Sequence, residues 1–175
     1  SSSSSSDKTE YIVLGTAYAL DDEPEPTRGR LLVFAVEGGN VGGNQDGSMA
    51  MDLVDEEEGE GRNSSAAGIP RRLVLIRENE TRGAVYSLEP FHGMLLAGVN
   101  SKTQLYKWSP GGGGGSDGTA ELKSVCGHHG HILALYIRSH GDFIIVGDLM
   151  KSVSLLAYRP LENTIDEIAR DYNAM

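Results

Sequence analysis

The sequence is poor in the features that mark several protein classes. Its 175 residues include one cysteine, Cys126, which excludes an intrachain disulfide and favours a reducing compartment. No apolar run approaches the roughly 18 residues of a membrane-spanning helix. The first residues, SSSSSSDKTE, have neither the basic region nor the apolar region of a secretory signal. Lysine and arginine total 15 against 25 acidic residues and form no cluster. We therefore expect no membrane contact and no direct contact with DNA.

The acidic excess lies mainly in one segment. Residues 38–70 hold seven acidic residues and one arginine, whereas the net charge of the whole sequence is −10. This segment, the serine-rich start and the glycine run at 110–118 contain too little apolar surface to offset the entropy of ordering. We predict a disordered tail at 1–10, disordered inserts at 38–70 and 110–118, and one folded domain over the rest of 11–175. Because the sequence does not begin with methionine, we expect it to be a piece of a longer protein.

The remaining sequence is rich in short apolar and β-branched runs, and we predict an all-β protein. The pairs His-Gly at 92–93 and 140–141 are tight-turn signals between such runs. Residues 164–172 have helical propensity, but their place in the repeat described next predicts a strand. The other predicted strands are residues 11–20, 30–37, 72–79, 84–91, 94–100, 103–108, 121–126, 131–138, 142–148 and 152–159.

The strands repeat at a fixed interval. Gly98 closes the run LLAG and Gly147 closes IIVG, 49 residues later. Gly15 closes IVLG, and the distance from Gly15 to Gly98 is about 50 residues once the insert at 38–70 is subtracted. A period of about 40–50 residues with four strands in each unit is typical of β-propeller blades. We predict a partial propeller of two and a half to three four-stranded blades. A sandwich of about eleven strands is the alternative.

Motifs for catalysis are scarce. The cluster CGHHGH, with Cys126, His128, His129 and His131, resembles a zinc-ligand set. However, neighbouring residues of an extended strand point to opposite faces, and no second ligand cluster accompanies it. We interpret it as a loop entering a strand, and we predict no metal and no cofactor. Asp148 follows a strand and is predicted to cap a turn. Neither a phosphate-binding glycine loop nor a nucleophile elbow is present, so we predict that the protein is not an enzyme.

Two further patterns concern surfaces. Four acidic residues lie in a proline-stiffened segment, DDEPE at 21–25, which would suit the rim of a site for a basic partner. Tyr86, Leu133, Leu135 and Tyr136 alternate along the strands at 84–91 and 131–138, and this alternation predicts side chains packed between sheets.

Four stretches carry a resemblance to a known family. They are YIVLGTAYALDDEPEPTRGRLLVF, TRGAVYSLEPFHGMLLAGVNSKTQLYKW, CGHHGHILALYIRSHGDFIIVGDLMKSVSLLAYRP and IDEIARDYNA. They resemble the third propeller of the large DNA damage-binding subunits, the adaptors of cullin-4 ubiquitin ligases. The match covers nearly everything outside the tail and the inserts. Three features depart from the family. Pro24 and Leu133 differ from the residues of the animal form, and the acidic insert is not part of the family pattern. The family has a tryptophan just beyond the text DYNAN, which is absent here because the given sequence ends at DYNAM.

The resemblance implies a non-enzymatic scaffold in nuclear DNA repair, present also in the cytoplasm. Its partners would be substrate-receptor proteins, held by a helical motif in a propeller cleft, and the remaining propellers of the parent chain. A partner subunit, and not this segment, would contact DNA. The alternative is a scaffold subunit of an mRNA cleavage-and-polyadenylation or splicing complex.

The resemblance also implies which residues bind the partner, and it changes the interpretation of the two tyrosines from core to interface. Tyrosine and arginine are favoured anchors at such interfaces. The implied partner-binding residues are Ala17, Glu23, Glu25, Ala84, Tyr86, Ser87, Leu133, Leu135, Tyr136, Lys151 and Arg170.

Overall fold

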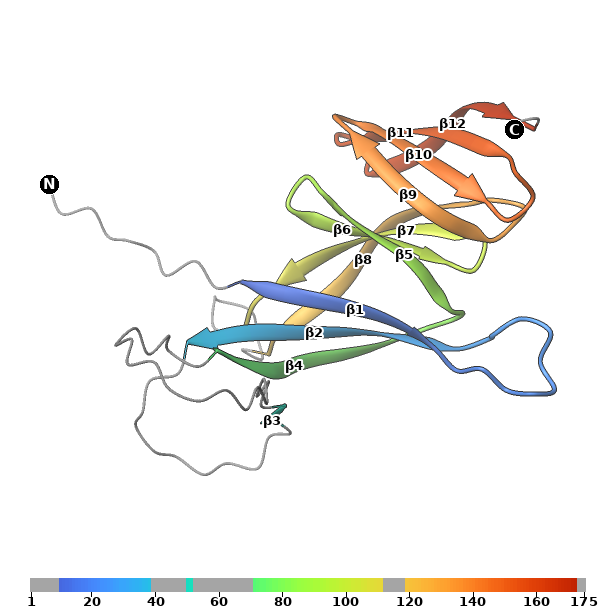
Figure 1. The fold of residues 1–175 in the computed structure, drawn as a ribbon. Helices are drawn as coiled ribbons and strands as arrows, with labels where there is room; N and C mark the ends of the chain where they lie inside the picture. Colours follow the sequence, from blue (N-terminus) through green and yellow to red (C-terminus); the bar gives the residue numbers. More distant parts are fainter. Residues whose placement is uncertain (1–9, 39–49, 52–70, 112–118, 173–175) are drawn as a thin grey trace, which may run out of the picture.

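The computed structural model describes residues 10–38, 50–51, 71–111 and 119–172. These residues form three antiparallel sheets of four strands each (Figure 1). Within the described ranges there is no α-helix, and thus no helix that could cross a membrane. The three sheets pack one after another, with the sheet β5–β8 between the other two (Figure 1). The predicted all-β partial propeller is confirmed, and the two-layer sandwich is wrong.

The first sheet has the strand order β1-β2-β4-β3. Its strands are β1 (Tyr11–Ala17), β2 (Gly29–Gly38), β3 (Ala50–Met51) and β4 (Arg71–Thr81). The predicted strand at 11–20 is therefore shorter than expected. Two-residue β3 falls inside the insert predicted at 38–70. Residues 39–49 and 52–70 of that insert, residues 1–9 of the predicted tail and residues 112–118 lie outside the described residues.

The second and third sheets follow the chain in simple order. The second sheet contains β5 (Val85–Phe91), β6 (Met94–Val99), β7 (Lys102–Ser109) and β8 (Glu121–His129). The third contains β9 (Ala134–His140), β10 (Phe143–Asp148), β11 (Val153–Arg159) and β12 (Thr164–Asp171). Because residues 164–171 pair with β11, the strand predicted from the repeat is confirmed over the helix suggested by propensity.

Both predicted His-Gly turns join the first two strands of a sheet. Phe91 pairs with Met94 across His92 and Gly93, which have φ angles of 49° and 72°. His140 pairs with Phe143, and Gly141 has a φ of 56°. Positive φ in a two-residue hairpin matches the right-handed twist of the flanking strands. The tight turns predicted at both positions are confirmed.

The repeated glycines allow one sheet to approach the next closely. A Cβ added to Gly15 on β1 would lie 2.4 Å from Cγ1 of Val85, the first residue of β5. A Cβ added to Gly98 on β6 would lie 2.7 Å from the carbonyl oxygen of Ala134, the first residue of β9. β1 and β6 therefore hold equivalent positions. It follows that the first sheet begins at the strand equivalent to β6 and β10, as the repeat predicted.

The apolar core lies between sheets and not within any one of them. One cluster joins the first and second sheets through Leu31, Val33, Ala97, Val99, Tyr106 and Leu122. A second cluster joins the second and third sheets through Phe91, Leu96, Leu105, Ile137, Ile144, Leu156, Tyr158 and Ile165, among others. Since each sheet buries its apolar face only against a neighbour, the packing is that of repeat units which depend on one another.

Candidate functional site

Several loops meet at one end of the three sheets, and we call this end the loop face. It consists of residues 18–28, 82–84, 100–101, 130–133 and 149–152. Hydrogen bonds connect these segments across the sheets. Asn100 donates to the carbonyl of Pro26, Gly130 N–H donates to the carbonyl of Ser101, and Leu149 N–H donates to the carbonyl of Leu133. The loop face is the place to look for the predicted partner-binding residues, because most of them lie on it or within two residues of it.

The acidic segment of the loop face is internally bonded. Thr27 donates from its N–H (3.3 Å) and its Oγ1 (3.0 Å) to the carboxylate of Glu23. Tyr18 N–H donates to the carbonyl of Arg28, which closes the loop at its base. Glu23 is therefore partly committed to holding the loop, whereas Glu25 is exposed. Ala17, the last residue of β1, is also exposed next to this loop.

The first strands of the second and third sheets, β5 and β9, each contain a bulge at the same place. Val85 pairs with Val99 and Ser87 pairs with Gly98, so Tyr86 is the extra residue. On β9, Ala134 pairs with Asp148 and Tyr136 pairs with Gly147, so Leu135 is the extra residue. A bulge turns a side chain away from the regular alternation of the strand. The equivalent bulges change the direction of two predicted partner-binding residues.

The two predicted tyrosines are exposed. Tyr86 is 38% exposed and Tyr136 is 71% exposed, so the core interpretation drawn from alternation is wrong for both. For Leu133 and Leu135 the predicted packing between sheets agrees better with the structure, because both side chains are half-buried. At Tyr86 the regular alternation of buried and exposed side chains breaks down, because Tyr86 is the extra residue of the bulge.

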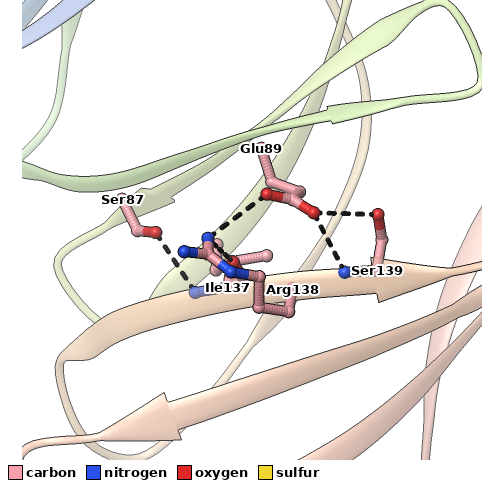
Figure 2. Close-up of polar contacts among 5 residues, drawn as sticks. All are labelled: Ser87, Glu89, Ile137, Arg138 and Ser139. Carbon is pink, nitrogen blue, oxygen red and sulfur yellow. Dashed lines mark hydrogen bonds and ion pairs between the residues drawn. The ribbon is translucent and has the colours of Figure 1, made fainter.

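Ser87 forms a hydrogen bond between β5 and β9 (Figure 2). Its Oγ accepts a hydrogen bond from Ile137 N–H at 3.1 Å. Two residues further along β5, Glu89 accepts from the N–H and the Oγ of Ser139, both at 3.2 Å, and pairs with Arg138 at 3.3 Å. The sequence did not indicate a role for Glu89, because nothing in the neighbouring residues distinguishes it from any other acidic residue on a strand.

Ala84 is also an internal residue. Its side chain is buried, with 1% exposed, and its N–H donates to Oδ1 of Asn100 at 2.7 Å. Asn100, in the turn between β6 and β7, likewise was not predicted to be important. A turn signal at Asn100-Ser101 is present in the sequence, but it does not show which segment the asparagine side chain would reach.

Arg170 is held by residues of its own sheet, the third. Only 11% of its side chain is exposed; Nη2 lies 2.8 Å from Glu167 and Nε donates to Ser154 Oγ at 2.9 Å. Glu167 also lies 3.5 Å from His128 Nε2 on β8. Of the predicted cations, Lys151 is exposed and adopts a φ of 63°. Lys151 is thus available to a partner, while Arg170 already has an acidic neighbour.

Asp148 caps the turn that contains Lys151, as predicted. Its carboxylate accepts from Met150 N–H at 2.8 Å and from Ser152 N–H at 3.0 Å, and it also accepts from the Ser152 hydroxyl. Partial burial opposes ionisation of this carboxyl group, but the hydrogen bonds from Ser152 and Met150 outweigh it and lower the pKa of Asp148. The loop 149–152 is therefore pinned at its base.

Three of the four residues of the histidine cluster lie in a strand, and His131 lies in the loop that leads into β9. Cys126, His128 and His129 belong to β8, which corrects the interpretation of this motif as a loop entering a strand. Burial raises the pKa of the Cys126 thiol, which disfavours the thiolate needed for a metal ligand. In the part of the chain that the structure describes, no three histidine, cysteine or acidic side chains are placed to hold a metal ion.

A cleft of about 590 Å³ opens where the loop face meets the first and second sheets. Its lining is mixed: Glu25 and Glu80 are acidic, whereas Arg82 and Lys102 are basic. Asn100 and Tyr106 also contribute to its walls. The loop face therefore combines an acidic loop and a polar cleft, and the exposed Tyr86 lies two residues from it along β5.

Comparison with known proteins agrees with the resemblance read from the sequence. DNA damage-binding protein 1a of Arabidopsis thaliana is 51% identical over 168 residues, covering 96% of this chain and 12% of that protein. DNA damage-binding protein 1 of Oryza sativa subsp. japonica is 50% identical over 174 residues, covering 99% of this chain and 13% of that protein. The chain thus spans a small part of the length of these curated relatives. A family model described as the CPSF A subunit region matches residues 1–175, and the chain belongs to this family.

Proposed function

We propose that this chain is part of a non-enzymatic adaptor whose loop face docks substrate-receptor proteins of a cullin-4 ubiquitin ligase. The relatives that match nearly the whole chain are named DNA damage-binding proteins. These names support a scaffold that acts in DNA damage repair in the nucleus. They favour this function over the mRNA-processing scaffold, although the matching family model takes its name from the CPSF A subunit.

One observation carries the proposal: the exposure of Tyr86. Tyr86 lies on β5, in the sheet that has a neighbour on each side, yet 38% of it is exposed. β5 is an edge strand of that sheet and Tyr86 is the extra residue of its bulge, which leaves the side chain open to a partner. A tyrosine with an apolar ring and a polar tip, set on a strand two residues from the loop face, is the kind of residue that anchors protein interfaces.

The charge of the segment supports a protein partner in preference to DNA. The loop at 18–28 places the exposed carboxylates of Asp21, Asp22 and Glu25 on the docking face. A surface of this sign would repel phosphates and would attract a basic segment of a partner. We infer that the receptor presents a helical segment with basic residues towards the loop 18–28.

The test is the affinity of the full-length protein for a receptor of a cullin-4 ligase after the change Tyr86→Ala. We expect affinity to fall at least tenfold, because hot-spot aromatic residues contribute about 2 kcal/mol or more. Phe143→Ala is the matched control, since Phe143 is 49% exposed but lies at the opposite end of the sheets, beside the turn at Gly141. Equal affinities for the two variants, with both proteins folded, would refute the docking role of the loop face.

A further inference from the structure

Asn100 makes hydrogen bonds to three parts of the chain. Its Nδ2 donates to the carbonyl of Pro26 at 2.9 Å, and its Oδ1 accepts from Ala84 N–H at 2.7 Å. Its own N–H donates to the Ala84 carbonyl, and its carbonyl accepts from the N–H of Ala134. One residue in the β6–β7 turn thus connects the acidic loop, the link between the first and second sheets, and the start of β9.

Asparagine is suited to this position for two reasons. Its φ is 50°, in the left-handed region that asparagine tolerates better than most residues. Its carboxamide supplies both a donor and an acceptor, and here the two ends are used towards different segments. Aspartate would keep the conformation and the bond from Ala84, but it could not donate to Pro26.

Gly83 makes room for the asparagine side chain. A Cβ at Gly83 would lie 2.5 Å from Cγ of Asn100, and Gly83 has a φ of 142°. Any side chain at residue 83 would therefore displace the carboxamide from between the two segments. The glycine and the asparagine form one unit, although they lie on different connections.

The bond to Pro26 fixes the acidic loop relative to the second sheet. The other hydrogen bonds of residues 18–28, such as those from Thr27 to Glu23, join the loop to itself or to the neighbouring strand ends. Glu25, next to Pro26, lines the 590 Å³ cleft together with Asn100. Without the bond from Asn100, the loop would lose its position over the cleft, and its own hydrogen bonds would open more often.

We propose that Asn100 is a positioning residue that holds the loop 18–28 as the wall of the cleft, in the geometry that a receptor needs. The proposal rests on the docking function proposed above and names the residue that pre-organises it. Pre-organised loops bind more tightly, because less entropy is lost when the partner arrives.

The first measurement is hydrogen exchange of the loop amides in the full-length protein carrying Asn100→Asp. We expect the amides of Tyr18, Glu23 and Thr27 to exchange about fivefold faster, as expected for one lost hydrogen bond. Asn163→Asp is the matched control, because Asn163 also lies in a turn with φ of 52° and only accepts a hydrogen bond, from Tyr158. Unchanged exchange in Asn100→Asp would overturn the proposal.

The second measurement is affinity for the same receptor. We expect Asn100→Asp to weaken binding several-fold with an unchanged melting temperature, while Asn163→Asp binds normally. The direction of the change in affinity distinguishes two effects. An added carboxylate on the loop face would by itself strengthen binding to a basic partner, whereas loss of the bond to Pro26 should weaken it. Gly83→Ala should weaken binding in the same way, by displacing the carboxamide.

The outcomes separate this inference from the proposed function. If Tyr86→Ala weakens receptor binding but Asn100→Asp and Gly83→Ala do not, the docking face stands and the positioning role of Asn100 is overturned. If none of the three variants changes affinity, the docking function itself is wrong. Faster loop exchange together with weaker binding in both Asn100→Asp and Gly83→Ala would support the inference.

Discussion

The two interfaces between neighbouring sheets differ in how well they are filled. Between the second and third sheets, Phe91 on β5 is 3% exposed and its ring contacts that of Tyr158 at a centroid distance of 5.5 Å. Between the first and second sheets, an apolar groove of about 320 Å³ remains, lined among others by Tyr11, Leu95 and Trp108. The same kind of sheet packing therefore gives a closed core in one place and an open groove in the other.

The register of the strands gives the reason for this difference. Phe91 pairs with Met94 on β6, and Met94 is equivalent to Tyr11, since each lies four residues before its repeated glycine. Among the described residues, β1 pairs only with β2, so no strand carries a counterpart of Phe91 beside Tyr11. We infer that the first strand of a complete sheet closes the interface with the next sheet, as β5 does through Phe91, and that the first interface stays open because β1 has no such neighbour among the described residues.

The largest effect is expected for Phe91→Ala. Loss of a fully buried aromatic side chain should reduce the free energy of unfolding by about 3–5 kcal/mol. Tyr11→Ala is the comparison, because Tyr11 is half-buried beside the open groove and touches Trp108 edge-on; its removal should cost about 1 kcal/mol. Chemical denaturation followed by circular dichroism measures both, and equal losses would contradict the contrast between the interfaces.

A smaller effect is expected for Gly98→Ala. The new methyl group would meet the Ala134 carbonyl on the backbone of β9, so the two sheets must move apart, at a cost of about 1–3 kcal/mol. Gly147→Ala should be nearly neutral, because the nearest atoms to its added Cβ lie 3.6 Å away on Tyr136. The midpoints of urea unfolding distinguish the two variants. A large loss for Gly147→Ala would contradict the room for a methyl group beside this glycine.

The smallest effect is expected for Ser87→Ala. This change leaves the N–H of Ile137 without its side-chain partner in the contact between β5 and β9 (Figure 2), which should cost about 1 kcal/mol. Hydrogen exchange of the Ile137 amide is the direct readout and should become roughly fivefold faster. Thr16→Val on β1 serves as the control in the first interface, where the hydroxyl bonds only within its own sheet, to Arg30. Unchanged exchange at Ile137 would show that the polar contact is not formed.

Much of the fold could be predicted because strands and turns are local. The His-Gly turn at 92–93 and the apolar runs on each side of it are written in consecutive residues. The recurrence of Gly15, Gly98 and Gly147 then predicted the repeat of four-stranded units. The histidine motif misled the prediction in part, because β8 continues through His129, beyond the apolar run that indicated its end.

The candidate site was less predictable from pattern alone. Alternation predicted that Tyr86 is buried, and only the resemblance to a family placed it at an interface. Neither source indicated that Ala84 would be buried, that Arg170 would be held by Glu167, or that Asn100 would reach Pro26. Asn100 and Pro26 lie on different connections of the chain, and Arg170 also depends on Ser154 of the neighbouring strand. A sequence pattern does not show which of these residues meet in space.

The sequence by itself determined the all-β class, the interval of about 50 residues and the places where the chain turns. These features depend on side-chain alternation and on backbone angles, which are determined by interactions between residues close together in the chain. The tertiary structure alone decided which inner-strand residues face solvent and which segment Asn100 holds. A bulge and the packing of one sheet on the next set those positions, because both bring together residues that are far apart along the chain.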